Sequence, residues 1–252
     1  MIDQLYAFPV DTTWTHETTR VFVPIVAALV CFVSYWFTSI SRQFKARFQR
    51  HHAGDEAATR HIFAVKITGF LTMGVLPLAV CMAFIPEMGL ADYGLTVIPA
   101  TSLYSLAWTM GLCVLVVPLA AFSARKPKNL LNYPQNRATH WTRRIYALNL
   151  LGWAVYLFGY EFLFRGILLF PLVETLGVWP AIAVNIALYS ATHIPKGLDE
   201  TLGAIPLGLV LCLLTLASGT IWIAFLVHVA MAWTNSLTAL KHHPDIHYQP
   251  GT

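Results

Sequence analysis

Charged side chains are scarce in this sequence. Of its 252 residues, 16 are Lys or Arg and 12 are Asp or Glu, so charged residues make up 11% of the chain, whereas a soluble domain usually carries about 25%. Hydrophobic residues account for 57%, and the few charges lie in clusters separated by long uncharged runs. This distribution argues against a soluble globular protein and predicts an all-α, polytopic integral membrane protein.

Cysteine is also rare, and its pattern excludes two common small scaffolds. The four cysteines lie inside apolar runs and lack C-x-x-C spacing, which disfavours both a disulfide framework and a zinc ribbon. The sequence shows no internal repeat of fixed period, so a transporter built from repeated halves is the least favoured membrane class. The cysteines are Cys31, Cys81, Cys113 and Cys212.

The uncharged runs are long enough to cross a membrane. A helix needs roughly 20 apolar residues to span a hydrocarbon core of about 30 Å. The last run has a Ser218-Gly219-Thr220 break, which predicts two helices joined by a tight turn. Together the runs predict about seven transmembrane helices. They are residues 21–41, 67–86, 103–122, 145–174, 175–195 and 201–240.

The positions of the basic residues predict the orientation. Lys and Arg are enriched in cytoplasmic loops, and 14 of the 16 fall on one side if every span crosses once, mostly in segments 42–66 and 125–144. We therefore expect an integral protein of the inner (plasma) membrane of the cell, with its N-terminus outside and its C-terminus in the cytoplasm. The same loops carry the net charge of +4 and face anionic lipid headgroups, so the lipid bilayer is the expected partner and nucleic acid is not.

Three places inside the apolar runs carry ionisable or strongly polar groups. Such groups are costly in a membrane and mark functional sites by default. Glu161 and Arg165 are four residues apart, which places them on one helix face in the order that favours an ion pair. His193 ends the next run, and His228 lies in the last run with Asn235 two turns later.

Simple helix geometry brings these groups to similar depths. A hairpin that turns near Gly177 has 16 residues in each arm back to Glu161 and forward to His193, which is about 24 Å at 1.5 Å per residue. His228 lies eight residues beyond Thr220, about 12 Å from that end. The sequence therefore predicts one intramembrane cavity lined by a carboxylate, an arginine and two imidazoles, with activation of water as its chemistry.

These residues carry a resemblance to a known family. Glu161-x-x-x-Arg165-Gly166, then Tyr189-x-x-x-His193, then His228, resemble the three motifs of the CAAX-protease and bacteriocin-processing (CPBP, or Abi) intramembrane proteases. The resemblance implies a C-terminal four-helix core at residues 143–240, preceded by N-terminal helices and loops at 1–142 and followed by a cytoplasmic tail at 241–252. It further implies peptide-bond hydrolysis by a water that Glu161 activates, with help from His193, while His228 holds the oxyanion.

Two positions depart from the family pattern. The family commonly has paired glutamates in its first motif, and here Tyr160 stands at the first of them. Its third motif commonly reads His-x-x-x-Asn, and here the corresponding position is Ala232, with Asn235 one turn later. The expected catalytic set is Glu161, Arg165, His193, His228 and Asn235.

Alternatives remain open at this point. Glu161, His193 and His228 are three candidate ligands for a catalytic zinc, but the His-Glu-x-x-His motif is missing and one glutamate cannot readily be both ligand and base. We favour metal-free chemistry without a cofactor, on a peptide or membrane-protein substrate. Glu161 and Arg165 could also form an ion pair with a purely structural role, and His193 could only complement the dipole at a helix C-terminus. The rival function is a non-catalytic membrane scaffold or bacteriocin-immunity protein of the same fold.

Overall fold

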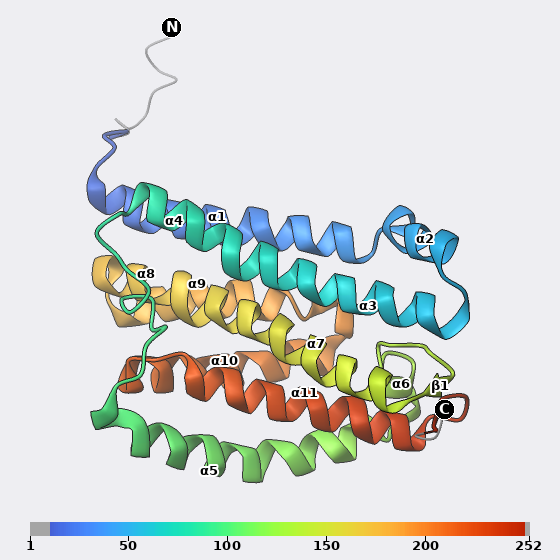
Figure 1. Cartoon of the computed structure of the whole chain (residues 1–252). Coiled ribbons are helices and arrows are strands. Elements are labelled where there is room, and N and C mark those ends of the chain that lie inside the picture. The colour runs from blue at the N-terminus through green and yellow to red at the C-terminus, as the bar shows by residue number, and fades with distance from the viewer. Residues whose placement is uncertain (1–10, 250–252) are drawn as a thin grey trace, which may run out of the picture.

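The computed structural model describes residues 11–249 and is built almost entirely of helices (Figure 1). Within these residues the only strands are β1 and β2, two residues each, which pair in parallel. The all-α fold expected from the sequence is therefore confirmed. In chain order the elements are α1 (His16–Ser39), α2 (Arg42–His51), α3 (Gly54–Phe70), η1 (Leu71–Val75), α4 (Leu76–Phe84), α5 (Pro99–Ala124), α6 (Pro127–Leu130), β1 (His140–Trp141), α7 (Arg143–Glu161), η2 (Phe162–Ile167), α8 (Leu169–Leu176), α9 (Val178–Ala191), η3 (Ile194–Lys196), α10 (Leu198–Ser218), α11 (Trp222–His242) and β2 (His247–Tyr248).

Six helices in the described part of the chain are long and apolar enough to cross a membrane, where the sequence predicted about seven. The difference lies in residues 175–195. There α9 has only 14 residues, about 21 Å, because it begins after Gly177 at φ +81° and ends before the Pro195 turn. The other spans are His16–Ser39, Gly54–Phe84, Pro99–Ala124, Arg143–Leu176, Leu198–Ser218 and Trp222–His242.

The second span begins earlier than the sequence predicted. The sequence placed Lys66 in a loop just before residue 67, but α3 already begins at Gly54, with Asp55 and Glu56 in its first turn, where acidic side chains suit the helix dipole. Lys66 therefore lies inside the helix, and its side chain is buried.

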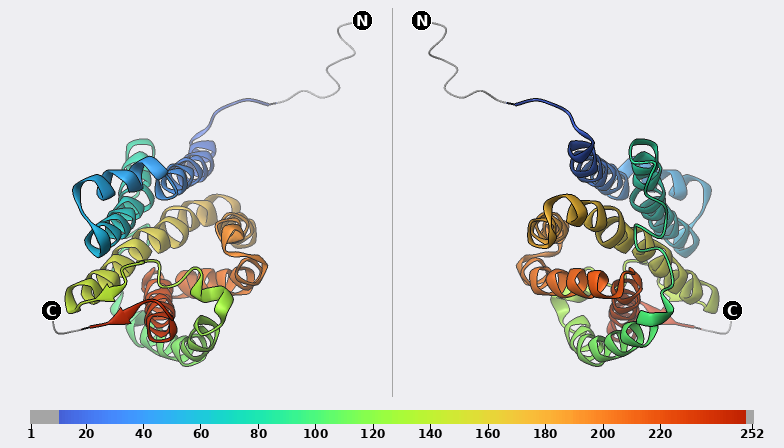
Figure 2. Two further views of the ribbon diagram at one scale, coloured as in Figure 1. Left: turned by 90° about the vertical axis from the view of Figure 1, so that its right-hand side faces the viewer. Right: turned by 90° about the vertical axis from the view of Figure 1, so that its left-hand side faces the viewer.

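The helices form three layers. In Figures 1 and 2, α1 and α3–α4 form one outer layer and α5 with α11 the other, and α7 lies between them. The span Arg143–Leu176 is accordingly 78% buried over its most apolar window, whereas only 11% of the α5 window is buried. Helix α5 thus presents most of its surface to lipid, and α7 is the central helix of the protein.

Two glycines allow α7 to lie close to its neighbour. A Cβ atom on Gly159 would be 2.8 Å from the Phe70 Cα, and one on Gly74 would be 3.1 Å from the Gly159 Cα. Small residues of this kind are what membrane helices use to approach each other closely. The crossing positions the end of α7, where Glu161 lies.

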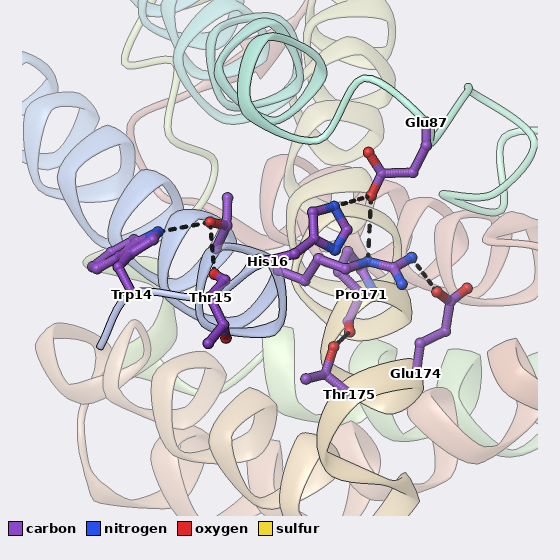
Figure 3. Close-up of polar contacts among 9 residues, drawn as sticks. Trp14, Thr15, His16, Glu87, Pro171, Glu174 and Thr175 are labelled. Carbon is purple, nitrogen blue, oxygen red and sulfur yellow. Dashed lines mark hydrogen bonds and ion pairs between the residues drawn. The ribbon is translucent and has the colours of Figure 1, made fainter. Parts of the chain in front are cut away.

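One end of the bundle is held together by charged and polar side chains. Arg20, at the start of α1, contacts Glu87 with 3.7 Å between Nε and Oε1 and pairs with Glu174 of α8, while His16 lies 2.9 Å from the same Glu87 (Figure 3). The turn between α10 and α11 joins this end, because Trp222 donates to the Thr96 carbonyl at 2.7 Å.

The opposite end carries most of the basic residues and a connecting loop at 125–142. Asp55 accepts hydrogen bonds from the backbone N–H groups of Thr139 and His140, at 2.7 and 2.9 Å. Lys128 in the same connection pairs with Asp199 at the start of α10. The termini of α3, α7 and α10 therefore meet here, together with α2 and the C-terminal end of α11 (Figure 1).

Candidate active site

The site is built around a local change of helix type after Glu161. Helix α7 continues as the π-helical turn η2, in which the Leu168 N–H bonds the Leu163 carbonyl at 2.9 Å. The Phe164 carbonyl accepts a hydrogen bond from the Asn185 side chain of α9, and Cys212 of α10 donates to Asn185 Oδ1 at 3.3 Å. Insertions of this kind in a helix are frequent at functional sites.

Asn185 was not singled out from the sequence. Its signal was available, since it is a polar amide in the middle of an otherwise apolar run, and it is fully buried in the structure. It joins α9 to α10 and to the π-helical turn, at the carbonyl of the residue before Arg165.

Glu161 joins two of the predicted residues. Its Oε1 lies 2.5 Å from His228 Nδ1, and its Oε2 lies 3.4 Å from Arg165 Nε. Both Glu161 and Arg165 are 0% exposed. The expected four-residue ion pair is present, and the structure adds a histidine from α11 on its other side.

Arg165 is held by charge and by an aromatic ring. Its guanidinium carbon lies 4.2 Å from the centroid of the Tyr189 ring, a favourable position for a cation over a π face. Within residues 11–249 none of its three side-chain nitrogens makes a hydrogen bond. The electrostatic attraction of Glu161 is therefore the main compensation for burying this charge.

His193 is oriented by a backbone carbonyl. Its Nδ1 lies 3.0 Å from the Tyr189 carbonyl oxygen and 3.2 Å from Thr192 Oγ1. A carbonyl only accepts, so the hydrogen-bond network assigns the proton to Nδ1 and leaves Nε2 as an acceptor. The Tyr160 hydroxyl lies 2.7 Å from the same Thr192 Oγ1.

A cavity of about 610 Å³ lies against these residues. Its polar lining includes Tyr160, His193, His228 and Asn235, and it extends to Gln135 in the 125–142 loop. Much of the remaining wall is apolar and comes from α1, α5, α10 and α11. These wall residues include Phe32, Trp36, Val116, Leu119, Leu207 and Met231.

The expectation that Glu161 and Arg165 line this cavity is wrong. Neither residue contributes to its lining, and both are fully buried. The physical reason is that the Glu161 carboxylate pairs with the Arg165 guanidinium and contacts His228 inside the protein, where the pair is kept away from lipid. His193, His228 and Asn235 do lie at the cavity, as the sequence suggested.

Glu161, His193 and His228 do not fit the three-ligand zinc site that the sequence left open as an alternative. In the part of the chain that the structure describes, no three His, Cys, Asp or Glu side chains are grouped so as to hold a metal ion. One oxygen of Glu161 faces the Nδ1 proton of His228 and the other faces Arg165, so the carboxylate is already engaged on both sides.

Comparison with known proteins assigns part of the chain to one family. Residues 142–234 match a family model described as type II CAAX prenyl endopeptidase Rce1-like. The matched segment contains Glu161, Arg165, His193 and His228, and it confirms the resemblance seen in the sequence. No curated protein and no solved structure matches the chain.

Proposed function

Residues 142–234 match the Rce1-like family of intramembrane CAAX-type endopeptidases, and we propose that this chain hydrolyses a peptide bond in a membrane-associated protein or peptide. The observation that carries the proposal is the contact of 2.5 Å between Glu161 Oε1 and His228 Nδ1. It places an imidazole supported by a buried carboxylate at the wall of a large cavity.

His228 is the proposed general base. A carboxylate beside Nδ1 holds the imidazole in one tautomer and stabilises the imidazolium that forms when Nε2 takes a proton. His228 Nε2 removes a proton from water, the water oxygen adds to the peptide carbonyl carbon, and the same proton passes to the amine when the C–N bond breaks. Glu161 acts through His228 and is a positioning residue, as is Arg165.

Two further groups at the cavity complete the reaction. His193 offers Nε2 as an acceptor, which orients the attacking water through its second proton. The amide of Asn235, which also lines the cavity, supplies an N–H donor for the oxyanion. Hydrogen-bond donors placed where negative charge develops in the transition state often make the largest single contribution to rate acceleration.

The test replaces Glu161 with glutamine, which keeps the size of the side chain and removes its charge. We expect kcat for cleavage of a peptide library by the detergent-purified protein to fall by about 10²-fold or more. KM should stay the same, because Glu161 does not line the cavity. His228→Ala should lower kcat by as much, and the double variant should lower it no further than either single variant, because the two residues act as a unit.

Glu56→Gln is the matched control, since Glu56 also pairs with an arginine four residues later but is partly exposed and is not among the partners of His228, whereas Glu161 is buried against that histidine. Its activity should equal that of the parent. Additive losses in Glu161→Gln and His228→Ala would contradict the proposed pair.

The rival function is a membrane scaffold or immunity protein that binds a peptide without cutting it. The observation in its favour is Tyr160, which stands where the family commonly has its first glutamate and faces the cavity. Peptide binding without turnover in the parent protein would establish this rival. Cleavage that survives Glu161→Gln but disappears in Tyr160→Phe would assign the chemistry to Tyr160 instead.

A further inference from the structure

The hydroxyl of Thr192 joins three groups at the cavity wall. Its Oγ1 lies 2.7 Å from the Tyr160 hydroxyl, 2.7 Å from the Tyr189 carbonyl oxygen and 3.2 Å from His193 Nδ1. Tyr160, Thr192 and His193 all line the cavity. The proposed reaction uses His193, but it gives no role to Thr192 or to the Tyr160 hydroxyl.

The hydrogen-bond network assigns each proton of this cluster. The Tyr189 carbonyl only accepts, and its two lone pairs take the hydroxyl proton of Thr192 and the Nδ1 proton of His193. Thr192 has then used its one proton, so Tyr160 is the donor in their contact of 2.7 Å. The reverse direction would leave Thr192 Oγ1 and the Tyr189 oxygen 2.7 Å apart with no proton between them. The Tyr160 oxygen therefore remains available as an acceptor and not as a donor.

The Tyr160 ring is held in place by its neighbours. The residue is 4% exposed, and its ring centroid lies 5.9 Å from that of Tyr156, in a stacked arrangement, and 4.9 Å from that of Phe164. The imidazoles of His228 and His193 lie 5.7 and 6.5 Å from it, both nearly perpendicular. The phenol oxygen is therefore a preorganised acceptor beside the two histidines of the proposed reaction.

A neutral acceptor in a largely apolar cavity suits a neutral donor. A carboxylate only accepts, so it cannot pair with this oxygen. The backbone N–H is the donor that every peptide residue except proline carries, and burying it without a partner is costly. In the proposed reaction His228 and His193 take the two protons of the attacking water, which leaves the Tyr160 oxygen to the peptide.

We propose that Tyr160, positioned by Thr192, accepts a hydrogen bond from a backbone N–H of the peptide beside the scissile bond. This inference rests on the proposed function in that the same cavity holds the peptide. It adds a specificity, because the residue that supplies this N–H can be neither proline nor N-methylated. Tyr160 contacts the substrate, whereas Thr192 acts through Tyr160 and is a positioning residue.

The experiment measures peptide binding to the detergent-purified full chain by energy transfer from Trp36 and Trp153, which line the cavity. The probe is dansyl-Leu-Ala-Leu-Ala-Leu-amide, together with analogues in each of which an ester oxygen replaces one backbone N–H. The signal is read on mixing, before turnover. We expect one analogue to bind about tenfold more weakly than the all-amide peptide, because it leaves the phenol oxygen without its donor.

Three variants connect this preference to the cluster. Tyr160→Phe keeps the ring and removes the acceptor, so it should bind that analogue and the all-amide peptide equally. Thr192→Val keeps the branched shape but frees the phenol proton, so it should lose most of the preference. Thr192→Ser keeps the hydroxyl and should keep the preference. A purely structural role of Thr192 would instead lower the thermal midpoint of Thr192→Val and leave the preference unchanged.

The chain offers a matched control for each substitution. Thr175 Oγ1 also bonds a carbonyl of its own helix, that of Pro171 at 3.1 Å, but Thr175 does not line the cavity. Tyr104 of α5 does not line it either. Thr175→Val and Tyr104→Phe should therefore both keep the tenfold preference.

Equal binding of the all-amide peptide and every analogue to the parent would overturn the proposal, as would a preference that persists in Tyr160→Phe. Loss of kcat in Tyr160→Phe with the parent's binding pattern would assign the oxygen to the attacking water instead. Binding and cleavage are read separately. A parent that shows the preference but cleaves nothing would refute the proposed function and leave the acceptor in place, and cleavage without the preference would do the reverse.

Discussion

Two glutamate–arginine pairs with the same four-residue spacing lie in opposite environments, and they allow a matched test of what the buried pair contributes. Glu56 and Arg60 lie near the start of α3 with side chains 38% and 47% exposed, and Glu161 and Arg165 are both 0% exposed. The perturbation is Arg→Met at each site, which removes the charge and keeps most of the side-chain volume.

The expected magnitudes differ by several-fold. An exposed pair at this spacing contributes about 0.3–0.5 kcal/mol, so Arg60→Met should leave stability nearly unchanged. Removing one partner of a buried pair typically costs about 3–5 kcal/mol, because the other charge stays buried without compensation. His228 still faces Glu161 in Arg165→Met and takes over part of the compensation, so we expect the lower end of that range.

The assay is thermal unfolding in detergent, followed by tryptophan fluorescence. A loss of about 3 kcal/mol corresponds to a fall of about 6 °C or more in the midpoint for a chain of this size. The double variant Arg165→Met with Glu161→Gln buries no charge and should recover most of the loss. Equal midpoints for Arg165→Met and Arg60→Met, or a double variant less stable than Arg165→Met, would refute the argument.

Two other predictions follow from the helix crossing and from the charge distribution. Gly159→Ala places a methyl group 2.8 Å from the Phe70 backbone and should destabilise the protein by about 1–3 kcal/mol, whereas Gly111→Ala, with nothing within 4 Å of its Cβ, should not; equal midpoints in thermal unfolding would contradict the close crossing. Single cysteines near Lys126 and His243 should be shielded from a membrane-impermeant thiol reagent in intact cells and one near Asp92 should be labelled, and the reverse pattern would show that the orientation is inverted.

Much of the fold follows from uncharged runs and a few backbone-breaking residues. The break at Ser218-Gly219-Thr220 was expected to separate two helices, and α10 ends at Ser218 while Gly219 adopts φ +69°. The turn expected near Gly177 lies between α8 and α9. Both outcomes depend on local chemistry, because glycine is the residue that enters this backbone region without strain.

The positions of the charged residues alone predicted the wrong start for the second span. Because a charged residue was assumed to stay outside the membrane, the first loop was predicted to end at Lys66. In the structure Trp153, Tyr156 and Gln135 surround its ammonium group. These partners lie about 70 to 90 positions away in the sequence. Only the tertiary structure brings them to α3, so no local sequence pattern predicts the contact.

In the candidate site, too, sequence spacing predicted which residues contact each other, but it did not predict which way the side chains face. The spacing correctly indicated that Glu161 contacts Arg165, because residues four apart share a helix face. Which side of the central helix meets the cavity was beyond such reasoning, since it depends on how α7 packs against its neighbours in the tertiary structure. Tyr160 faces the cavity, and Glu161 faces Arg165 and His228.

The positions of Tyr160 and Glu161 also determine the charge of the cavity wall. A glutamate at position 160 would add a negative charge to the cavity wall, whereas Tyr160 adds none, and the charge of Glu161 is screened by Arg165 on one side and His228 on the other. The end of α7 therefore brings no carboxylate to the cavity wall, although His228, the proposed base at that wall, depends on the carboxylate of Glu161 behind it.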